Sequence, residues 1–183
     1  MFDTADSGAT TTNQTIFHAP FPVFLTVQLR DHWFKWTYLR AVQRAGMDIG
    51  MRAHDIVYSS GFTLSKLPYR QELVLVTPGD LGFTGEELTY DEFCVLLRRR
   101  GLRELLPETV LAARLAYKDQ PRGTSVILAA GPFSTPNIGS CLLDLTHSDG
   151  GPSMYCVRPV LYRDTRVLCE QPRSIYKQRS WET

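Results

Sequence analysis

The pattern of apolar residues changes once along this chain, and that change constrains the fold more than any other feature. As far as Tyr117, apolar side chains recur at helical spacing in three stretches, whereas from Ser125 onward they alternate with polar ones. Helices followed by short strands are typical of an α+β domain and not of a wound parallel sheet. We therefore predict three helices with short strands in the first two-thirds, then an antiparallel meander of about four strands.

The clearest helix signal is the sequence from Thr89 to Glu92, which has the spacing of a capping box. Arginines in the last turn and Gly101 just after it favour the helix end, so a helix is predicted over residues 89–100. A second helix is predicted over residues 32–45, ending at Gly46. The third begins at Pro107, a residue favoured at the first helical position.

Strands are predicted where β-branched and aromatic residues alternate with polar ones between turn residues. Pro22 confines the first strand to a sheet edge, or to a start just after the proline. The predicted strands are residues 21–27, 56–58 and 73–76 in the first part, and residues 125–130, 140–146, 154–162 and 166–169 in the second.

A chain of 183 residues has the length of one domain. Residues 1–15 are polar, with no basic region followed by an apolar core, so they are predicted to be a flexible leader and not a signal peptide. Residues 16–183 are predicted to form a single α+β domain. No apolar stretch approaches the ~20 residues that cross a bilayer, so we expect a cytoplasmic protein without membrane contact.

Charge and cysteine content exclude several functional classes. With 20 basic and 19 acidic residues the net charge is +1, so no overall field draws the chain to nucleic acid or membrane. The cysteines, none in a C-x-x-C pair, are predicted to be reduced and mostly buried. The histidines are too far apart for a local metal cluster, so neither metal nor cofactor is expected.

Catalytic motifs are absent from the sequence, including phosphate-binding loops, H-E-x-x-H and the G-x-S-x-G elbow. One arrangement suggests chemistry: Cys141, Asp144 and His147 occur within one predicted strand and its turn. Six residues of extended chain separate the thiol from the imidazole by ~20 Å, too far for proton transfer. A small hydrolase or transferase remains an alternative only if distant residues, including His54, assemble a Cys/His site.

Arginines form two groups that could bind phosphate. The structural alternatives are compensation of a helix dipole for the first group and a solvated edge strand for the second. With tyrosines between its arginines, the C-terminal group could also stack on bases, which makes nucleic acid a possible partner. The first group is Arg98, Arg99, Arg100 and Arg103, and the second is Arg158, Arg163, Arg166 and Arg173.

Aromatic residues crowd the first predicted helix, where Trp33, Phe34, Trp36 and Tyr38 point to more than one side. One side belongs to the core. The other is either an exposed surface that docks a partner, with Trp33 and Trp36 as binding residues, or a second face that is buried under the leader. Our leading hypothesis is a non-enzymatic binding protein whose partner is another protein or a second copy of itself.

Two segments carry a resemblance to a known group of proteins. The chain has an L-G-F-T opening at Leu81–Thr84 and an L-x-Y-K-D-Q-P-x-G turn at Leu115–Gly123. Over about residues 70–150 it resembles an uncharacterised family of small bacterial proteins that share both segments. The resemblance implies a bacterial, cytosolic source and supplies no activity or catalytic residue. The family's tryptophan- and asparagine-rich tail is replaced here by an arginine-rich one, so no role of that tail carries over.

Overall fold

The computed structural model describes residues 21–30, 32–136 and 139–172 of the protein. Four helices and ten strands lie within these residues. The helices are α1 (Lys35–Arg44), α2 (Met51–Tyr58), α3 (Tyr90–Arg99) and α4 (Thr109–Ala116). The strands are β1 (Val23–Leu29), β2 (Asp48–Ile49), β3 (Tyr69–Val76), β4 (Glu87–Thr89), β5 (Thr124–Leu128), β6 (Phe133–Thr135), β7 (Gly139–Ser148), β8 (Gly151–Val157), β9 (Val160–Tyr162) and β10 (Val167–Glu170).

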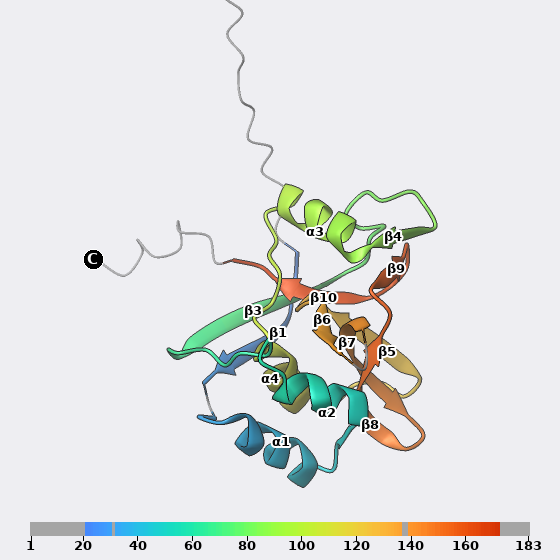
Figure 1. Ribbon diagram of the computed structural model, residues 1–183. Helices are drawn as coiled ribbons and strands as arrows, with labels where there is room; N and C mark the ends of the chain where they lie inside the picture. The colour runs from blue at the N-terminus through green and yellow to red at the C-terminus, as the bar shows by residue number, and fades with distance from the viewer. Residues whose placement is uncertain (1–20, 31, 137–138, 173–183) are drawn as a thin grey trace, which may run out of the picture.

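One large curled sheet organises the domain, with strand order β1-β3-β10-β5-β7-β8-β2 and β6 paired to β7 outside that path. Helices α1, α2 and α4 pack on one face, and α3 with the small β4-β9 ladder packs on the other (Figure 1). Each face has its own apolar cluster, so the sheet is a central layer between two cores. None of the helices in the described ranges is long and apolar enough to cross a membrane.

The predicted order of three helices followed by a four-stranded antiparallel meander is wrong. Strand β10 returns across the domain to lie between β3 and β5, antiparallel to the first and parallel to the second. Strand β2 pairs parallel with β8. Alternation in a sequence reveals which residues form strands, but pairing between distant strands depends on tertiary packing that no local period encodes.

The segment around Ile56 is also corrected, because it forms the end of helix α2 and not a strand. The β-branched pair Ile56-Val57 followed by an aromatic residue is typical of strands, and this local composition misled the prediction. In the structure Ala53, Ile56 and Val57 are fully buried on one side, at the i, i+3 and i+4 spacing of a helix.

Local capping signals gave correct predictions. The capping box is present, with the Glu92 amide donating to Thr89 Oγ1 and the Thr89 amide donating to Glu92 Oε2 across 2.8 Å. Gly101 follows α3 with φ +71°, a conformation that glycine adopts without steric cost.

Strand β1 starts just after Pro22 at a sheet edge, as predicted. The predicted strand 154–162 is divided into β8 and β9, and residues 1–15 lie outside the described ranges.

A fully buried arginine joins α4 to the sheet. The guanidinium of Arg114 donates to Gln120 Oε1 across 2.7 Å and to the Tyr117 carbonyl across 2.5 Å. The Gln120 amide in turn donates to the Leu145 carbonyl of β7 across 2.8 Å. These bonds fix the turn after α4 against the sheet, and the turn's sequence is the one that carried the family resemblance.

Candidate interaction surface

Three large aromatic side chains are exposed at the start of α1. Trp33 is 70% exposed, Phe34 60% and Trp36 52%, while Tyr38 and Leu39 on the opposite side of the helix are buried. The rings of Phe34 and Trp36 stack with centroids 6.3 Å apart and planes 15° apart. Among the described residues nothing covers this side of the helix, and the leader, which the second alternative placed over it, lies outside the described ranges.

The exposed segment is anchored on the chain that follows α2. The ammonium group of Lys35 donates to the Ser59 carbonyl across 2.8 Å and lies 5.7 Å from the centroid of the buried Phe62 ring. Burial lowers the pKa of Lys35. The Thr37 hydroxyl donates to the Phe34 carbonyl across 2.6 Å, which supports the first turn of the helix. The aromatic side chains thus project from a backbone that is held on both sides.

Arg30 links this segment to the loop before β3. Its guanidinium lies 4.2 Å from the centroid of the Trp33 ring, within the range of a cation–π contact. The same group donates to the carbonyls of Ser65 and Lys66. The next residue, Leu67, is 74% exposed. Arg30, Trp33, Phe34, Trp36 and Leu67 are called the aromatic surface below.

A buried carboxylate holds both segments that carry this surface. Glu108, at the start of α4, is fully buried. Its oxygens accept hydrogen bonds from the backbone amide of Arg30 across 2.6 Å and from that of Ser65 across 2.6 Å. The hydroxyl of Tyr38 donates to it across 2.7 Å. Hydrogen bonds to a charged group contribute about 1.5–3 kcal/mol each, so Glu108 stabilises the junction strongly.

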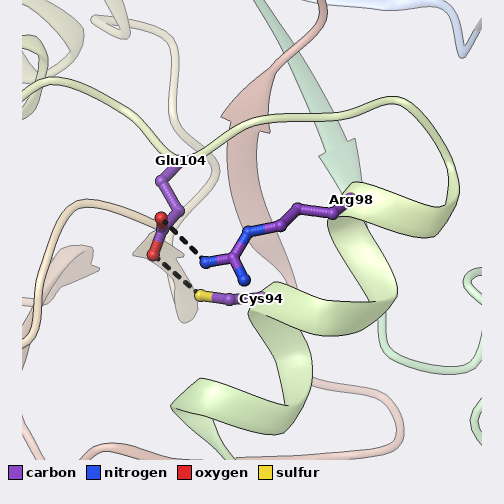
Figure 2. Close-up of polar contacts among 3 residues, drawn as sticks. All are labelled: Cys94, Arg98 and Glu104. Carbon is purple, nitrogen blue, oxygen red and sulfur yellow. Dashed lines mark hydrogen bonds and ion pairs between the residues drawn. The ribbon is translucent and has the colours of Figure 1, made fainter.

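The first arginine group lies at the end of α3 and in the loop after it. Figure 2 shows Arg98, whose guanidinium is 3.6 Å from Glu104 Oε2, while Cys94 Sγ donates to Glu104 Oε1 across 2.9 Å. Burial, assisted by Glu104, raises the pKa of Cys94 to about 12, so this thiol is not a nucleophile at neutral pH. Arg99 and Arg103 are exposed nearby.

Arg100 is only partly exposed and has one guanidinium nitrogen near Gly82. The predicted first group therefore comes together at one end of α3. Glu104 offsets the charge of Arg98, so the group is less basic than its sequence suggests.

The second arginine group does not form one surface in the described residues. Arg158 follows β8, while Arg163 and Arg166 lie between β9 and β10. A cavity of about 680 Å³ contains Arg163 beside Glu86 and Asp164, so its charge is mixed. Arg173 lies outside the described ranges.

Cys141, Asp144 and His147 are kept apart by the strand that contains all three. Strand β7 runs unbroken from Gly139 to Ser148, so the thiol and the imidazole are separated by about 20 Å of extended chain. Alternation of side chains places Asp144 on the opposite face from the other two residues. Burial raises the pKa of the Cys141 thiol, which disfavours the nucleophilic thiolate.

The remaining contacts of these residues are structural. The carboxylate of Asp144 accepts from the hydroxyls of Ser125 and Thr146, and His147 Nδ1 contacts the Gln120 carbonyl. His54 is exposed on α2 against the ring of Tyr58. Within the described ranges, the structure does not bring these candidate residues into one Cys/His site.

Sequence reasoning found the aromatic residues but missed Arg30, Leu67 and Glu108. Glu108 directly follows Pro107 in the sequence, a first-turn position where an acidic residue is ordinarily solvated and interacts with the helix dipole. Its partners lie 43 to 78 residues away along the chain, so no local pattern could identify them.

Comparison with known proteins adds no relative. No family model, no curated protein and no solved structure matches the chain. The resemblance to small bacterial proteins stays a prediction, and the function has to be argued from the geometry of the chain itself.

Proposed function

We propose that this is a non-enzymatic interaction protein that binds another protein through the aromatic surface. One observation carries the proposal: Trp33, Phe34 and Trp36 are more than half exposed on an anchored segment. Tryptophan and other aromatic residues are enriched in the buried centres of protein interfaces and supply much of their binding energy. A contiguous exposed apolar surface of this kind marks a site of association.

Pre-organisation supports the proposal further. Association has an entropic cost for each side chain and loop that becomes ordered, and a surface that is already fixed has a smaller cost. Glu108, Lys35 and Arg30 fix the two segments that carry the aromatic surface before any partner binds. The cation–π contact also orients the Trp33 ring.

Protein is a better-supported partner than nucleic acid. A nucleic-acid surface needs basic groups directed at phosphates, beside rings on which bases stack. The guanidinium of Arg30 and the ammonium of Lys35 already donate to backbone carbonyls, and Glu104 lies beside Arg98. The two cations that contact the segment of the aromatic rings are therefore already engaged by backbone carbonyls.

The test compares affinity capture from the source cells by the wild type, by Trp33→Ser/Trp36→Ser and by a matched control, Met51→Ser/Tyr162→Ser. The control removes two exposed apolar side chains that lie elsewhere, at 80% and 59% exposure. We expect specific proteins to be lost only with the tryptophan variant. Equal capture by all three proteins, or retention only of nucleic acid detected at 260 nm, would contradict the proposal.

A further inference from the structure

Strand β1 is an unprotected sheet edge. Among the described residues it pairs only with β3, so the outer row of its backbone amides and carbonyls has no partner strand. Its sequence, Val-Phe-Leu-Thr-Val-Gln-Leu, contains neither a charged residue nor a proline. Natural edges are ordinarily blocked by charge, proline or shortness, as at the opposite edge, where β2 has two residues. A register shift between Val23 and Leu25 interrupts the pairing of β1 with β3, so the regular edge that the described residues leave open to strand addition is residues 25–29.

A cavity of about 290 Å³ lies beside this edge. It has room for a long side chain and is smaller than most cofactor sites. Apolar side chains of α4 form one wall and the edge strand forms the other. The lining residues are Thr26, Val27 and Gln28 of β1, Ala112, Leu115 and Ala116 of α4, and His32 and Tyr38.

The carboxylate that accepts a hydrogen bond from Tyr38, one of the residues lining the cavity, favours some occupants of the cavity over others. The Tyr38 hydroxyl donates to the buried carboxylate of Glu108, whose other donors are two backbone amides. All three donors are neutral, and in the described ranges Glu108 forms no ion pair. The guanidinium of Arg30 lies in the same junction but donates to the carbonyls of Ser65 and Lys66, so Glu108 has no ion-pair partner in the described ranges and favours a further cationic group nearby. The methylenes of a lysine or arginine also suit the alanine and leucine wall.

We infer that β1 and α4 form a docking groove for an extended peptide of a partner protein, which adds to the sheet as a further strand and inserts a lysine or arginine side chain beside Tyr38. Backbone hydrogen bonds along the edge supply affinity, and the cavity supplies specificity, as in other cases of strand addition. A second copy of this chain is a poorer occupant, because its own β1 has no cationic residue to insert. The groove is lined by His32 and Tyr38, which flank the aromatic surface in the sequence, but by none of the residues that make up that surface.

The test is a titration of isotope-labelled protein, followed by amide chemical shifts, with short extended peptides that differ only in a central Lys, Leu or Glu. We expect shifts concentrated in residues 23–29 and 112–116, and binding of the Lys peptide about tenfold tighter than the Glu peptide, or about 1.4 kcal/mol. Absence of shifts, shifts elsewhere, or equal binding of the Lys and Glu peptides would overturn the inference.

Two variants separate the groove from general effects on folding. Ala116 is exposed at the end of α4 and lines the cavity, so Ala116→Trp fills the groove without changing the core. Ala45→Trp, at the exposed end of α1, is the matched control. We expect at least a tenfold loss of peptide affinity in the first and none in the second, with circular dichroism unchanged in both. Equal affinity of the two variants would overturn the inference.

Two further results distinguish the other possible outcomes. Trp33→Ser/Trp36→Ser should keep full peptide affinity, so that failure of the proposed function and failure of this inference are separate results. Shifts of β1 amides that grow with protein concentration in the absence of peptide would identify a second copy as the occupant and overturn the inference.

Discussion

The hydroxyl of Tyr38 donates a hydrogen bond to Glu108 across 2.7 Å, and both side chains are buried. Tyr38 belongs to the helix that starts with the aromatic surface, and Glu108 also binds the backbone on both sides of that surface. The segments that carry the exposed aromatic side chains are therefore held by a buried polar junction.

Removal of the junction should destabilise the whole domain. Glu108→Ala leaves three buried or half-buried donors without an acceptor, and each such group costs about 1–3 kcal/mol. We expect the free energy of unfolding in urea to fall by about 3–5 kcal/mol, and by about 1–2 kcal/mol for Tyr38→Phe, which removes the hydroxyl that donates to Glu108. A loss below about 1 kcal/mol for Glu108→Ala would show that water replaces the carboxylate without cost.

The backbone conformation of Arg30 should make glycine a better replacement for it than alanine. Arg30 has φ +64°, a left-handed conformation that costs a residue with a Cβ roughly 1 kcal/mol and glycine almost nothing. Arg30→Ala and Arg30→Gly both lose the contact with Trp33 and the bonds to the carbonyls of Ser65 and Lys66.

The glycine variant should therefore be more stable than the alanine variant by about 0.5–1 kcal/mol in urea unfolding. The reverse order, which is usual where φ is negative, would mean that the left-handed turn is not populated in solution.

The buried arginine should be irreplaceable by an apolar side chain of similar length. Arg114→Met removes the bonds to Gln120 and to the Tyr117 carbonyl, and leaves one buried and one part-buried acceptor without this donor. We expect the unfolding free energy to fall by about 2–4 kcal/mol. Arg40→Met, on the exposed side of α1, is the matched control and should change it by less than about 0.5 kcal/mol. Similar values for the two variants would refute the structural role of Arg114.

Thiol ionisation should make the protein less stable in alkaline solution. Burial raises the pKa of Cys94, Cys156 and Cys169 from 9.0 to about 12 in each case. Between these values the unfolded chain loses protons that the folded chain keeps, so the stabilising contribution is complete below pH 9 and is lost as the pH rises towards 12.

Two measurements check this prediction. The urea midpoint should fall steadily above pH 9, and Cys169→Ala should reduce the slope. Alkylation with iodoacetamide near neutral pH should be slow for the native thiols and fast in denaturant. Rapid modification of Cys94 in the native state, or a urea midpoint that does not change with pH, would contradict the raised pKa values.

Local chemistry explains which features could be predicted from the sequence. The ends of α3 were predicted because Thr89, Glu92 and Gly101 act within one or two turns of their own position. The position of β10 between β3 and β5 could not be predicted, because its partners are distant in the chain and pairing leaves no periodic signal.

The candidate surface likewise has features that the sequence reveals and others that depend on tertiary packing. The crowding of tryptophans is visible in the sequence, and it led to a choice between exposure and burial that only packing decides. The acidic residue that holds the surface looks like an ordinary first-turn glutamate until its distant partners are known. In α2 the local composition was misleading, because the β-branched pair Ile56-Val57 is typical of a strand but is packed in a helix.

Site-specific photo-crosslinking in the source cells shows directly whether the aromatic surface contacts another protein. A photo-reactive phenylalanine analogue replaces Trp36 in one variant and Tyr162, also exposed but on β9, in the other. If the aromatic surface binds a protein, we expect a discrete protein adduct from position 36 only. Excess wild-type protein should compete this adduct away, and excess Trp33→Ser/Trp36→Ser should not. No adduct at position 36, or the same adducts from both positions, would contradict the proposed function.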